Sequence, residues 1–228
     1  TLSAGTISGL GMTGSIAYGT FETLNIRLGS GADAFAVQST HAGATNVEAG
    51  GGNDSVNVLT ISGATQVAAG DGDDAIGVGN MAPTTGGTVD GIGALLAIDG
   101  GGGSDSLDVD DTGDTAPNSG VLTATTLSGL GMAGGIGYLE LETLQVSLGS
   151  GGNRFDVLGT MRRDGVATLT RLNAGAGDDA VQVSLGAATG GPLVVDLQAG
   201  DDRFDGSASS LGLVVIGGAG RDAMSGGS

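Results

Sequence analysis

Apolar and polar residues alternate in short runs over much of this chain. Leu24, Ile26 and Leu28 alternate with Asn25 and Arg27, and the same alternation recurs at 35–37, 45–49, 56–58, 65–69, 76–78, 144–148 and 155–157. An alternation with period two is typical of strands that bury one face. No sustained period of 3.6, which would indicate helices, accompanies it. The pattern therefore predicts an all-β protein.

The chain also contains a long internal repeat. Residues 7–40 align without a gap on residues 127–160, and both copies contain the segments SGLGM and ETL at equivalent places. The offset between the copies is 120 residues. We therefore expect a first repeat unit at 1–120 and a second at 121–228, joined in one continuous rod.

A shorter element recurs inside each unit, and it consists of a strand, a glycine-rich acidic turn and a second strand. Clear copies are AGGGNDSVNV (49–58), AGDGDDAIGV (69–78) and GGGGSDSLDV (100–109). One position of the turn is occupied, in successive copies, by Asp33, Asp54, Asp74, Asp105, Asn153, Asp179, Asp202 and Asp222. A short repeat with near-identical turns favours coils stacked in register over a hairpin meander. We predict a right-handed parallel β-solenoid, of the β-helix or β-roll kind, with rungs of about 20 residues and the acidic turns along one edge.

The composition adds charge and location to this picture. The chain has 49 glycines, but 39% of its residues are hydrophobic and the mean hydropathy is +0.22, which favours a folded protein over a disordered one. The formal net charge is −18, and 21 of the 25 acidic residues are aspartates. A chain this acidic is not expected to bind nucleic acid, and no apolar run reaches the roughly 20 residues that cross a membrane. The absence of cysteine fits an extracellular bacterial protein.

Stacked coils would bring equivalent aspartates of successive turns within a few ångströms of one another. Like charges at that separation repel, so a divalent cation between the turns is expected to offset the repulsion. Carboxylates together with backbone carbonyls suit Ca²⁺ better than Mg²⁺. The carbonyls would come from the turn glycines Gly50, Gly52, Gly70, Gly72, Gly175, Gly177, Gly218 and Gly220.

An EF-hand is excluded, because Ala75 stands at the third ligand position after Asp71 and Asp73, and no Glu follows at the twelfth. The simpler alternative is that each aspartate only caps its own turn.

The turns resemble a known family. GGAGRDAMS (217–225) and GGGGSDSLD (100–108) fit in full the nonapeptide G-G-x-G-x-D-x-U-x of the RTX (haemolysin-type) calcium-binding repeats. In that family neighbouring turns share a Ca²⁺, which implies ligand roles for Asp54, Asp74, Asp105, Asp179 and Asp222, and with poorer motif matches for Asp33 and Asp202. Asn153 replaces the acid in its copy. RTX coils carry acidic turns on both edges, whereas one turn in about 20 residues predicts calcium along a single edge here, with a gap between Asp105 and Asn153.

Catalytic groups are sparse. His41 is the only histidine, there is no lysine, and Glu22 and Glu142 are a candidate glycosidase pair that we interpret as structural because each lies beside a strand. We therefore expect no enzyme.

The expected function is a calcium-stabilised structural repeat module of a bacterial extracellular or cell-surface protein (an adhesin, surface layer or filament) that provides a rigid rod and self-association. The expected partners are Ca²⁺, further copies or tandem neighbours and, as a candidate, cell-surface glycans. The alternative is a β-helical polysaccharide-binding or polysaccharide-degrading domain.

Overall fold

The computed structural model describes residues 1–186 and 190–226, and in these residues every regular element is a strand. No helix in this part of the chain has the length and apolar character needed to cross a membrane. The strands are β1 (Thr6–Ser8), β2 (Ser15–Ala17), β3 (Thr23–Arg27), β4 (Ala34–Val37), β5 (Ala44–Gly51), β6 (Ser55–Val58), β7 (Thr65–Asp71), β8 (Ala75–Val78), β9 (Leu96–Gly102), β10 (Ser106–Asp110), β11 (Ser119–Leu122), β12 (Thr126–Gly129), β13 (Ile136–Leu139), β14 (Thr143–Ser147), β15 (Arg154–Val157), β16 (Leu169–Asn173), β17 (Ala180–Val183), β18 (Leu193–Asp196), β19 (Arg203–Asp205), β20 (Val214–Ile216) and β21 (Ala223–Ser225).

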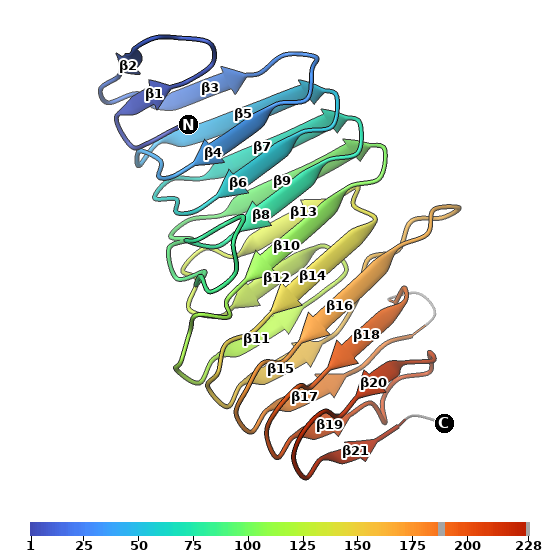
Figure 1. The fold of residues 1–228 in the computed structure, drawn as a ribbon. Helices are drawn as coiled ribbons and strands as arrows, with labels where there is room; N and C mark the ends of the chain where they lie inside the picture. The colour runs from blue at the N-terminus through green and yellow to red at the C-terminus, as the bar shows by residue number, and fades with distance from the viewer. Residues whose placement is uncertain (187–189, 227–228) are drawn as a thin grey trace.

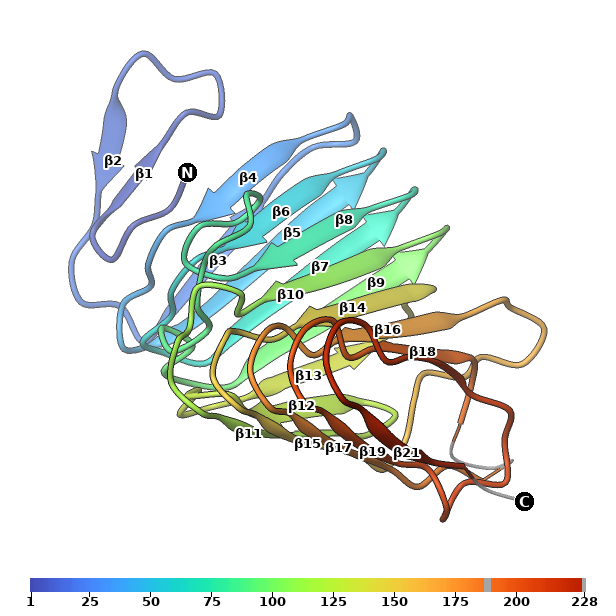
Figure 2. The same cartoon turned by 60° about the horizontal axis from the view of Figure 1, so that its bottom comes forward.

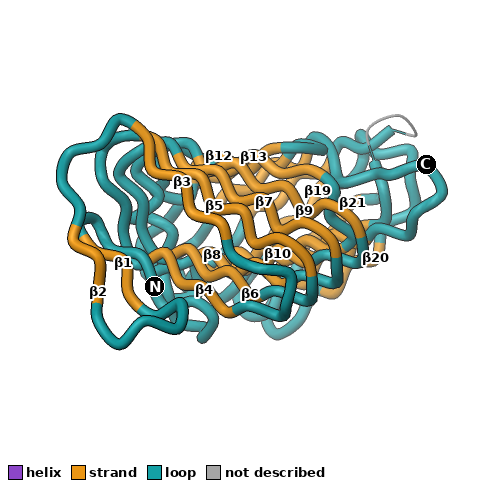
Figure 3. The backbone as a smooth tube through the Cα atoms, turned by 90° about the horizontal axis from the view of Figure 1, so that it is seen from above, coloured by secondary structure: helices purple, strands orange, loops and turns teal. Residues whose placement is uncertain are grey.

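Two large sheets make up most of the molecule, and β1 and β2 form a separate 2-stranded antiparallel sheet. An 8-stranded sheet has the order β20-β18-β16-β14-β10-β8-β6-β4, and an 11-stranded sheet has the order β21-β19-β17-β15-β11-β12-β13-β9-β7-β5-β3. The chain passes from one sheet to the other and back, so that successive passages stack side by side (Figure 1). Viewed from above, the strands form two layers with loops at both edges (Figure 3). The prediction of an all-β fold with extensive parallel pairing is confirmed, and the arrangement is compatible with a solenoid.

The core lies between the two sheets and consists of apolar columns, mostly of aliphatic side chains. Phe35, Val56, Ile76, Leu107 and Leu144 are register partners on successive strands of the 8-stranded sheet, and all are at most 3% exposed. Each alternates with a more exposed neighbour, as the period-two pattern predicts. Burial of one apolar face per strand therefore fixes the register, because a slip by one residue would turn the whole column outward.

The junction of the two repeat units differs from the other coils. Strands β11, β12 and β13 lie side by side in the 11-stranded sheet, and β12 is antiparallel to both neighbours. β13 continues the sheet of the first unit by pairing with β9, and β11 continues that of the second unit by pairing with β15. The chain thus leaves the 8-stranded sheet at β10 and returns to the same sheet at β14. In the first unit each acidic turn leads from the 11-stranded to the 8-stranded sheet, and in the second unit it leads from the 8-stranded to the 11-stranded sheet.

The prediction that the acidic turns lie along a single edge is wrong because of this exchange in the order of the two sheets. β10 follows its acidic turn and β14 precedes its own, yet the two strands are parallel and in register, with Leu107 opposite Leu144. The acidic turns of the first unit therefore lie at one edge of the sheets and those of the second unit at the opposite edge. Figures 1 and 2 show the turns that lead into β4, β6, β8 and β10 on one side, and those that follow β14, β16, β18 and β20 on the other.

The acidic turns stack too closely for side chains at several of their glycines. Gly50 and Gly70 are register partners on β5 and β7. Gly70 has a φ of +111°, and a Cβ added to it would overlap the carbonyl oxygen of Gly50. Glycine meets both requirements, because it adopts positive φ without strain and has no Cβ. The glycine-rich sequence of the turn is therefore a condition for stacking the coils.

Candidate functional site

The motif aspartates of the first unit form a hydrogen-bonded column, here called column 1. The backbone N–H of Asp33 donates to Oδ1 of Asp54 at 2.7 Å, and the N–H of Asp54 donates to Oδ1 of Asp74 at 2.7 Å. The N–H of Asp74 donates to Oδ1 of Asp105 at 2.9 Å. Each carboxylate thus binds the amide of the preceding rung, and the partner of the bond lies 20 to 31 residues away in sequence.

A second column, column 2, lies at the opposite edge. The N–H of Asn118 donates to Oδ1 of Asn153 at 3.0 Å, and that of Asn153 donates to Asp179 at 2.6 Å. The N–H of Asp179 donates to Oδ1 of Asp202 at 2.8 Å, and the N–H of Asp202 donates to Oδ1 of Asp222 at 3.3 Å. The predicted ligands are therefore divided into two separate groups, and Asp105 and Asp179 are not brought together.

The second carboxylate oxygen of most of these aspartates has no partner. Oδ2 of Asp54, Asp74, Asp105, Asp179 and Asp202 is buried and accepts no hydrogen bond, and each of these residues is at most 3% exposed. Asp33 differs, because its Oδ2 accepts the N–H of Gly29 at 3.1 Å and the residue is only half-buried. An unpartnered buried oxygen on a charged group is costly, so these five atoms mark positions at which a positive charge or a proton is needed.

Asn153 reveals what surrounds the second side-chain atom. Its Nδ2 donates to the carbonyl oxygen of Gly149 at 3.4 Å and to that of Ala174 on the next rung at 3.5 Å. An amide is satisfied there because the surrounding groups are acceptors. Where aspartate occupies the same motif position, a carboxylate oxygen replaces the amide nitrogen. By equivalence, the site then holds only oxygen ligands, which is the donor set of Ca²⁺.

The predicted carbonyls run along the columns between rungs. The carbonyl oxygens of Gly50, Gly52, Gly70, Gly72 and Gly177 each face the equivalent glycine of the next rung, so closely that a Cβ there would overlap them. That of Gly175 accepts the N–H of Ala199 at 3.1 Å. Gly218 and Gly220 belong to the last turn, and their Cα atoms face carbonyls of the preceding rung. These peptide oxygens therefore lie between successive turns of each column.

Burial also raises the pKa of four of the column carboxyls. The pKa of Asp105 is raised from its ordinary value of 3.8 to about 6 and that of Asp179 to about 7. Those of Asp74 and Asp202 are raised as well. Desolvation is the main cause, and neighbouring carboxylates of the column add to it, while the backbone hydrogen bond opposes it. Without a cation, the fold thus favours the protonated form.

This shift predicts how the metal-free protein responds to pH. A carboxyl whose pKa is higher in the folded state adds stability below its unfolded pKa and loses it as pH rises through the folded value. Between about pH 4 and about pH 7 the melting temperature in EDTA should therefore fall by several degrees. Ca²⁺ should reduce the fall, because bound carboxylates stay ionised, whereas Asp111, whose pKa burial raises to about 7, lies outside the columns and keeps its share. A melting temperature in EDTA that rises or stays level over this interval would contradict the prediction.

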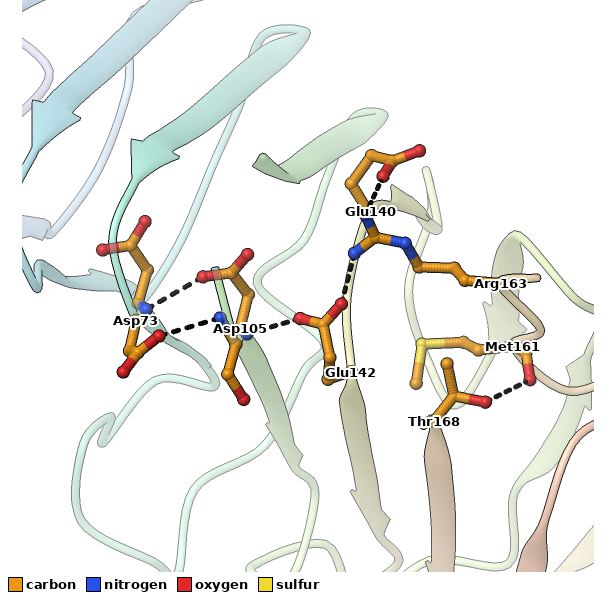
Figure 4. A network of polar contacts seen from close by, with 9 residues as sticks. Asp73, Asp105, Glu140, Glu142, Met161, Arg163 and Thr168 are labelled. Carbon is orange, nitrogen blue, oxygen red and sulfur yellow. Dashed lines mark hydrogen bonds and ion pairs between the residues drawn. The ribbon is translucent and has the colours of Figure 1, made fainter. Parts of the chain in front are cut away.

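Column 1 ends on Glu142 rather than on another motif aspartate (Figure 4). Oε2 of Glu142 accepts the N–H of Asp105 at 2.7 Å, and its Oε1 pairs with Arg163. The same guanidinium pairs with Glu140. Glu142 is 8% exposed, so Arg163 neutralises a nearly buried charge at the foot of the column. Sequence reasoning missed this role, because Glu142 lies 37 residues beyond Asp105, outside the short repeat.

Loss of Arg163 should therefore destabilise the junction. Arg163→Met keeps an unbranched side chain but leaves the Glu142 carboxylate unpaired, and we expect a loss of about 2 kcal/mol in the free energy of unfolding. Adding Glu142→Gln should restore most of it, since an amide oxygen can still accept the Asp105 N–H. Urea unfolding measures both variants, and equal stability of the single and double variants would rule out the charge-pairing role.

A second ladder runs outside the first and was also missed. The N–H of Asp73 donates to Oδ1 of Asn53 at 3.0 Å, and the N–H of Ser104 donates to Oδ1 of Asp73 at 2.9 Å. Asp178 and Asp201 are linked in the same way in the second unit, at 2.9 Å. These residues are exposed, so they join adjacent turns without burying charge. The signal in the sequence is the polar residue that immediately precedes every motif aspartate except Asp33, which follows Ala32.

The comparisons with known proteins leave the site to be interpreted from its own geometry. The chain matches no protein-family model, and a search of curated proteins finds no match. Within the described ranges 1–186 and 190–226, no group of three or more His, Cys, Asp or Glu side chains is arranged to hold a metal ion. A cation between two rungs would accordingly take one or two carboxylates and fill its remaining positions with peptide oxygens and water.

Proposed function

We propose that this chain is a calcium-stabilised structural module of an RTX-like bacterial extracellular protein. It would be a right-handed parallel β-solenoid that serves as a rigid rod in an adhesin, a surface layer or a filament. The proposal is carried by one observation: five stacked motif aspartates each bury a carboxylate oxygen that has no hydrogen-bond partner. The alternative that each aspartate only caps its own turn does not describe these side chains, because Oδ1 of each accepts the amide of the preceding rung and Oδ2 accepts no hydrogen bond.

The residues present fit a hard cation. Such ions would lie between successive rungs, bound in column 1 by Asp54, Asp74 and Asp105 and in column 2 by Asp179 and Asp202, whose Oδ2 atoms are unpartnered. Asp33 and Asp222 would contribute at the ends of the columns, where they are only half-buried. Bound calcium would supply the positive charge that stacked carboxylates need in order to stay ionised. Because the columns are separate, each would bind and respond on its own.

Coupling of folding to calcium suits a protein that works outside the cell. Stacked charges oppose the coil until the cation binds, so the metal-binding free energy adds directly to the stability of the fold. Extracellular calcium modules typically bind at about 10⁻⁴ to 10⁻³ M, which is far above cytosolic calcium. The same rod would associate with further copies or tandem neighbours.

The test is a calcium titration of the EDTA-treated protein followed by circular dichroism. We expect the β-sheet signal and the melting temperature to rise with Ca²⁺ and to respond much less to Mg²⁺, which requires a stricter octahedral site. A signal and melting temperature that ignore Ca²⁺ up to about 10 mM, a large excess over such sites, would disprove the proposal.

A further inference from the structure

The N-terminal end of the molecule exposes residues whose counterparts are buried at the junction of the two units. The internal repeat pairs Ile16 with Ile136, and these are 52% and 1% exposed. Phe21 is 50% exposed, whereas its counterpart Leu141 is 1% exposed. Glu22 is exposed as well, in contrast to Glu142 at 8%. The junction therefore shows which kind of structure covers this surface.

At the junction, β9 and β10 cover β13 and β14. Leu96 is the register partner of Ile136, Ile98 of Tyr138, and Leu107 of Leu144. The two backbone segments approach closely, because a Cβ on Gly134 would overlap the backbone of Ala94. The counterpart of Gly134 is Gly14, which has no atom within 4 Å of its Cβ position and no positive φ. Nothing in the described chain requires glycine there, whereas a closely packed neighbour would.

The C-terminal end presents a second copy of the covering structure. Residues 213–225 match residues 96–108, with Asp222 at the place of Asp105, so β20 and β21 correspond to β9 and β10. Met224 is 53% exposed, while its counterpart Leu107 is 1% exposed. Leu213 and Val215, the counterparts of Leu96 and Ile98, are only partly buried. Both halves of the junction are thus repeated at the two ends, each without its partner.

The sheets are also placed for this contact. β3 and β21 are the outermost strands at opposite ends of the 11-stranded sheet, and each has one unpaired edge. In the first unit the strand before each acidic turn belongs to the 11-stranded sheet, and in the second unit the strand after each acidic turn does. β3 and β21 therefore belong to the same sheet. A second copy could therefore extend the sheet directly, and open edges favour such pairing.

We infer that the N-terminal face, formed by β2 and β3, binds the C-terminal face, formed by β20 and β21, of a second copy of this chain, head to tail. The contact repeats the internal junction, with Ile16 against Leu213, Tyr18 against Val215 and Leu24 against Met224. Glu22 accepts the N–H of Asp222, as Glu142 accepts that of Asp105. This inference deepens the self-association of the proposed function and rests on it, but it does not require the calcium sites.

Cysteine cross-linking tests the register of the contact. At the junction Gln145 and Asp108 are register partners, and their counterparts at the two ends are Asn25 and Ser225. The chain has no cysteine. Oxidised Asn25→Cys/Ser225→Cys should give a ladder of disulfide-linked oligomers, because register partners meet the geometry of a disulfide. The matched variant Arg27→Cys/Ser225→Cys, which is two residues out of register, should give less than about a tenth as much. Equal yields, or no ladder in the first variant, would overturn the inference.

Sedimentation velocity separates this inference from the calcium proposal. The wild type should associate with increasing concentration, whereas Ile16→Asp/Phe21→Asp should stay monomeric with an unchanged circular dichroism spectrum, since both side chains are about half exposed in the single chain. A wild type that responds to Ca²⁺ yet remains monomeric would overturn the docking alone. Association with no response to Ca²⁺ would support the docking and overturn the calcium sites.

Discussion

Asp54→Asn/Asp74→Asn should melt at a higher temperature than the wild type in EDTA and at a lower temperature in Ca²⁺. Asparagine keeps the oxygen that accepts the amide of the preceding rung, as Asn153 does in the native chain, and it removes two buried negative charges. Relief of desolvation and repulsion should raise the melting temperature in EDTA by about 2 to 4 °C per site. In about 10 mM Ca²⁺, each lost site should forfeit about 2.7 kcal/mol of linkage stabilisation if its Kd is near 10⁻⁴ M.

The reversal of sign distinguishes the calcium site from simple turn capping. If the aspartates only capped their turns, the substitution would have the same effect with and without calcium. Asp179→Asn/Asp202→Asn is the matched variant for column 2, and it should show the same reversal while leaving the response of column 1 intact. Differential scanning calorimetry of both variants in EDTA and in Ca²⁺ makes the comparison, and a shift of one sign in both conditions would refute the account of the columns.

Gly70→Ala is expected to cause a large loss of stability. The new Cβ would overlap the carbonyl oxygen of Gly50, and the backbone φ of +111° is one that alanine rarely adopts. Overpacking and backbone strain each cost about 1 to 3 kcal/mol, so the free energy of unfolding should fall by at least about 3 kcal/mol. Gly31→Ala is the control, because its Cβ position has no atom within 4 Å and its φ is not positive.

Urea unfolding in EDTA measures both glycine variants without any contribution from calcium. The two substitutions add the same methyl group to turns of the same column, and they differ only in the space and backbone conformation at the site. A loss below about 1 kcal/mol for Gly70→Ala, or equal losses for both variants, would show that the coils are not stacked as tightly as described.

The strands and the repeated turns could be predicted from the sequence because both depend on local patterns. The alternation around Leu24 and Ile26 gives β3, and that around Val67 gives β7, since burial of one face dictates the period. The motif aspartates could be located because the turn repeats. Which edge each turn occupies could not be predicted, because alternation is the same for a strand of either sheet. The exchange depends on β11, β12 and β13, which add an antiparallel strand to one sheet between the units.

The residues at the ends of the columns could not be predicted from the sequence for a related reason. Glu142 acts as the last acceptor of column 1 through a contact that is distant in sequence, and Arg163 reaches it from a loop whose residues follow no repeat. Asn153 replaces the acid in its copy of the turn, but its side-chain oxygen keeps the hydrogen-bonded ladder intact by accepting the N–H of Asn118. The outer ladder through Asp73 uses exposed residues, for which the apolar pattern carries no information.

The most direct test of the calcium sites is a crystal structure of the protein grown in calcium, with anomalous scattering used to locate the ions. The account predicts anomalous peaks at both edges of the sheets, between successive rungs and about 2.3 to 2.6 Å from the unpartnered Oδ2 atoms of Asp54, Asp74, Asp105, Asp179 and Asp202. It also predicts no peak beside the side chain of Asn153, whose amide donates to the neighbouring carbonyls. Columns without peaks at saturating calcium, or peaks only at surface carboxylates elsewhere, would contradict it.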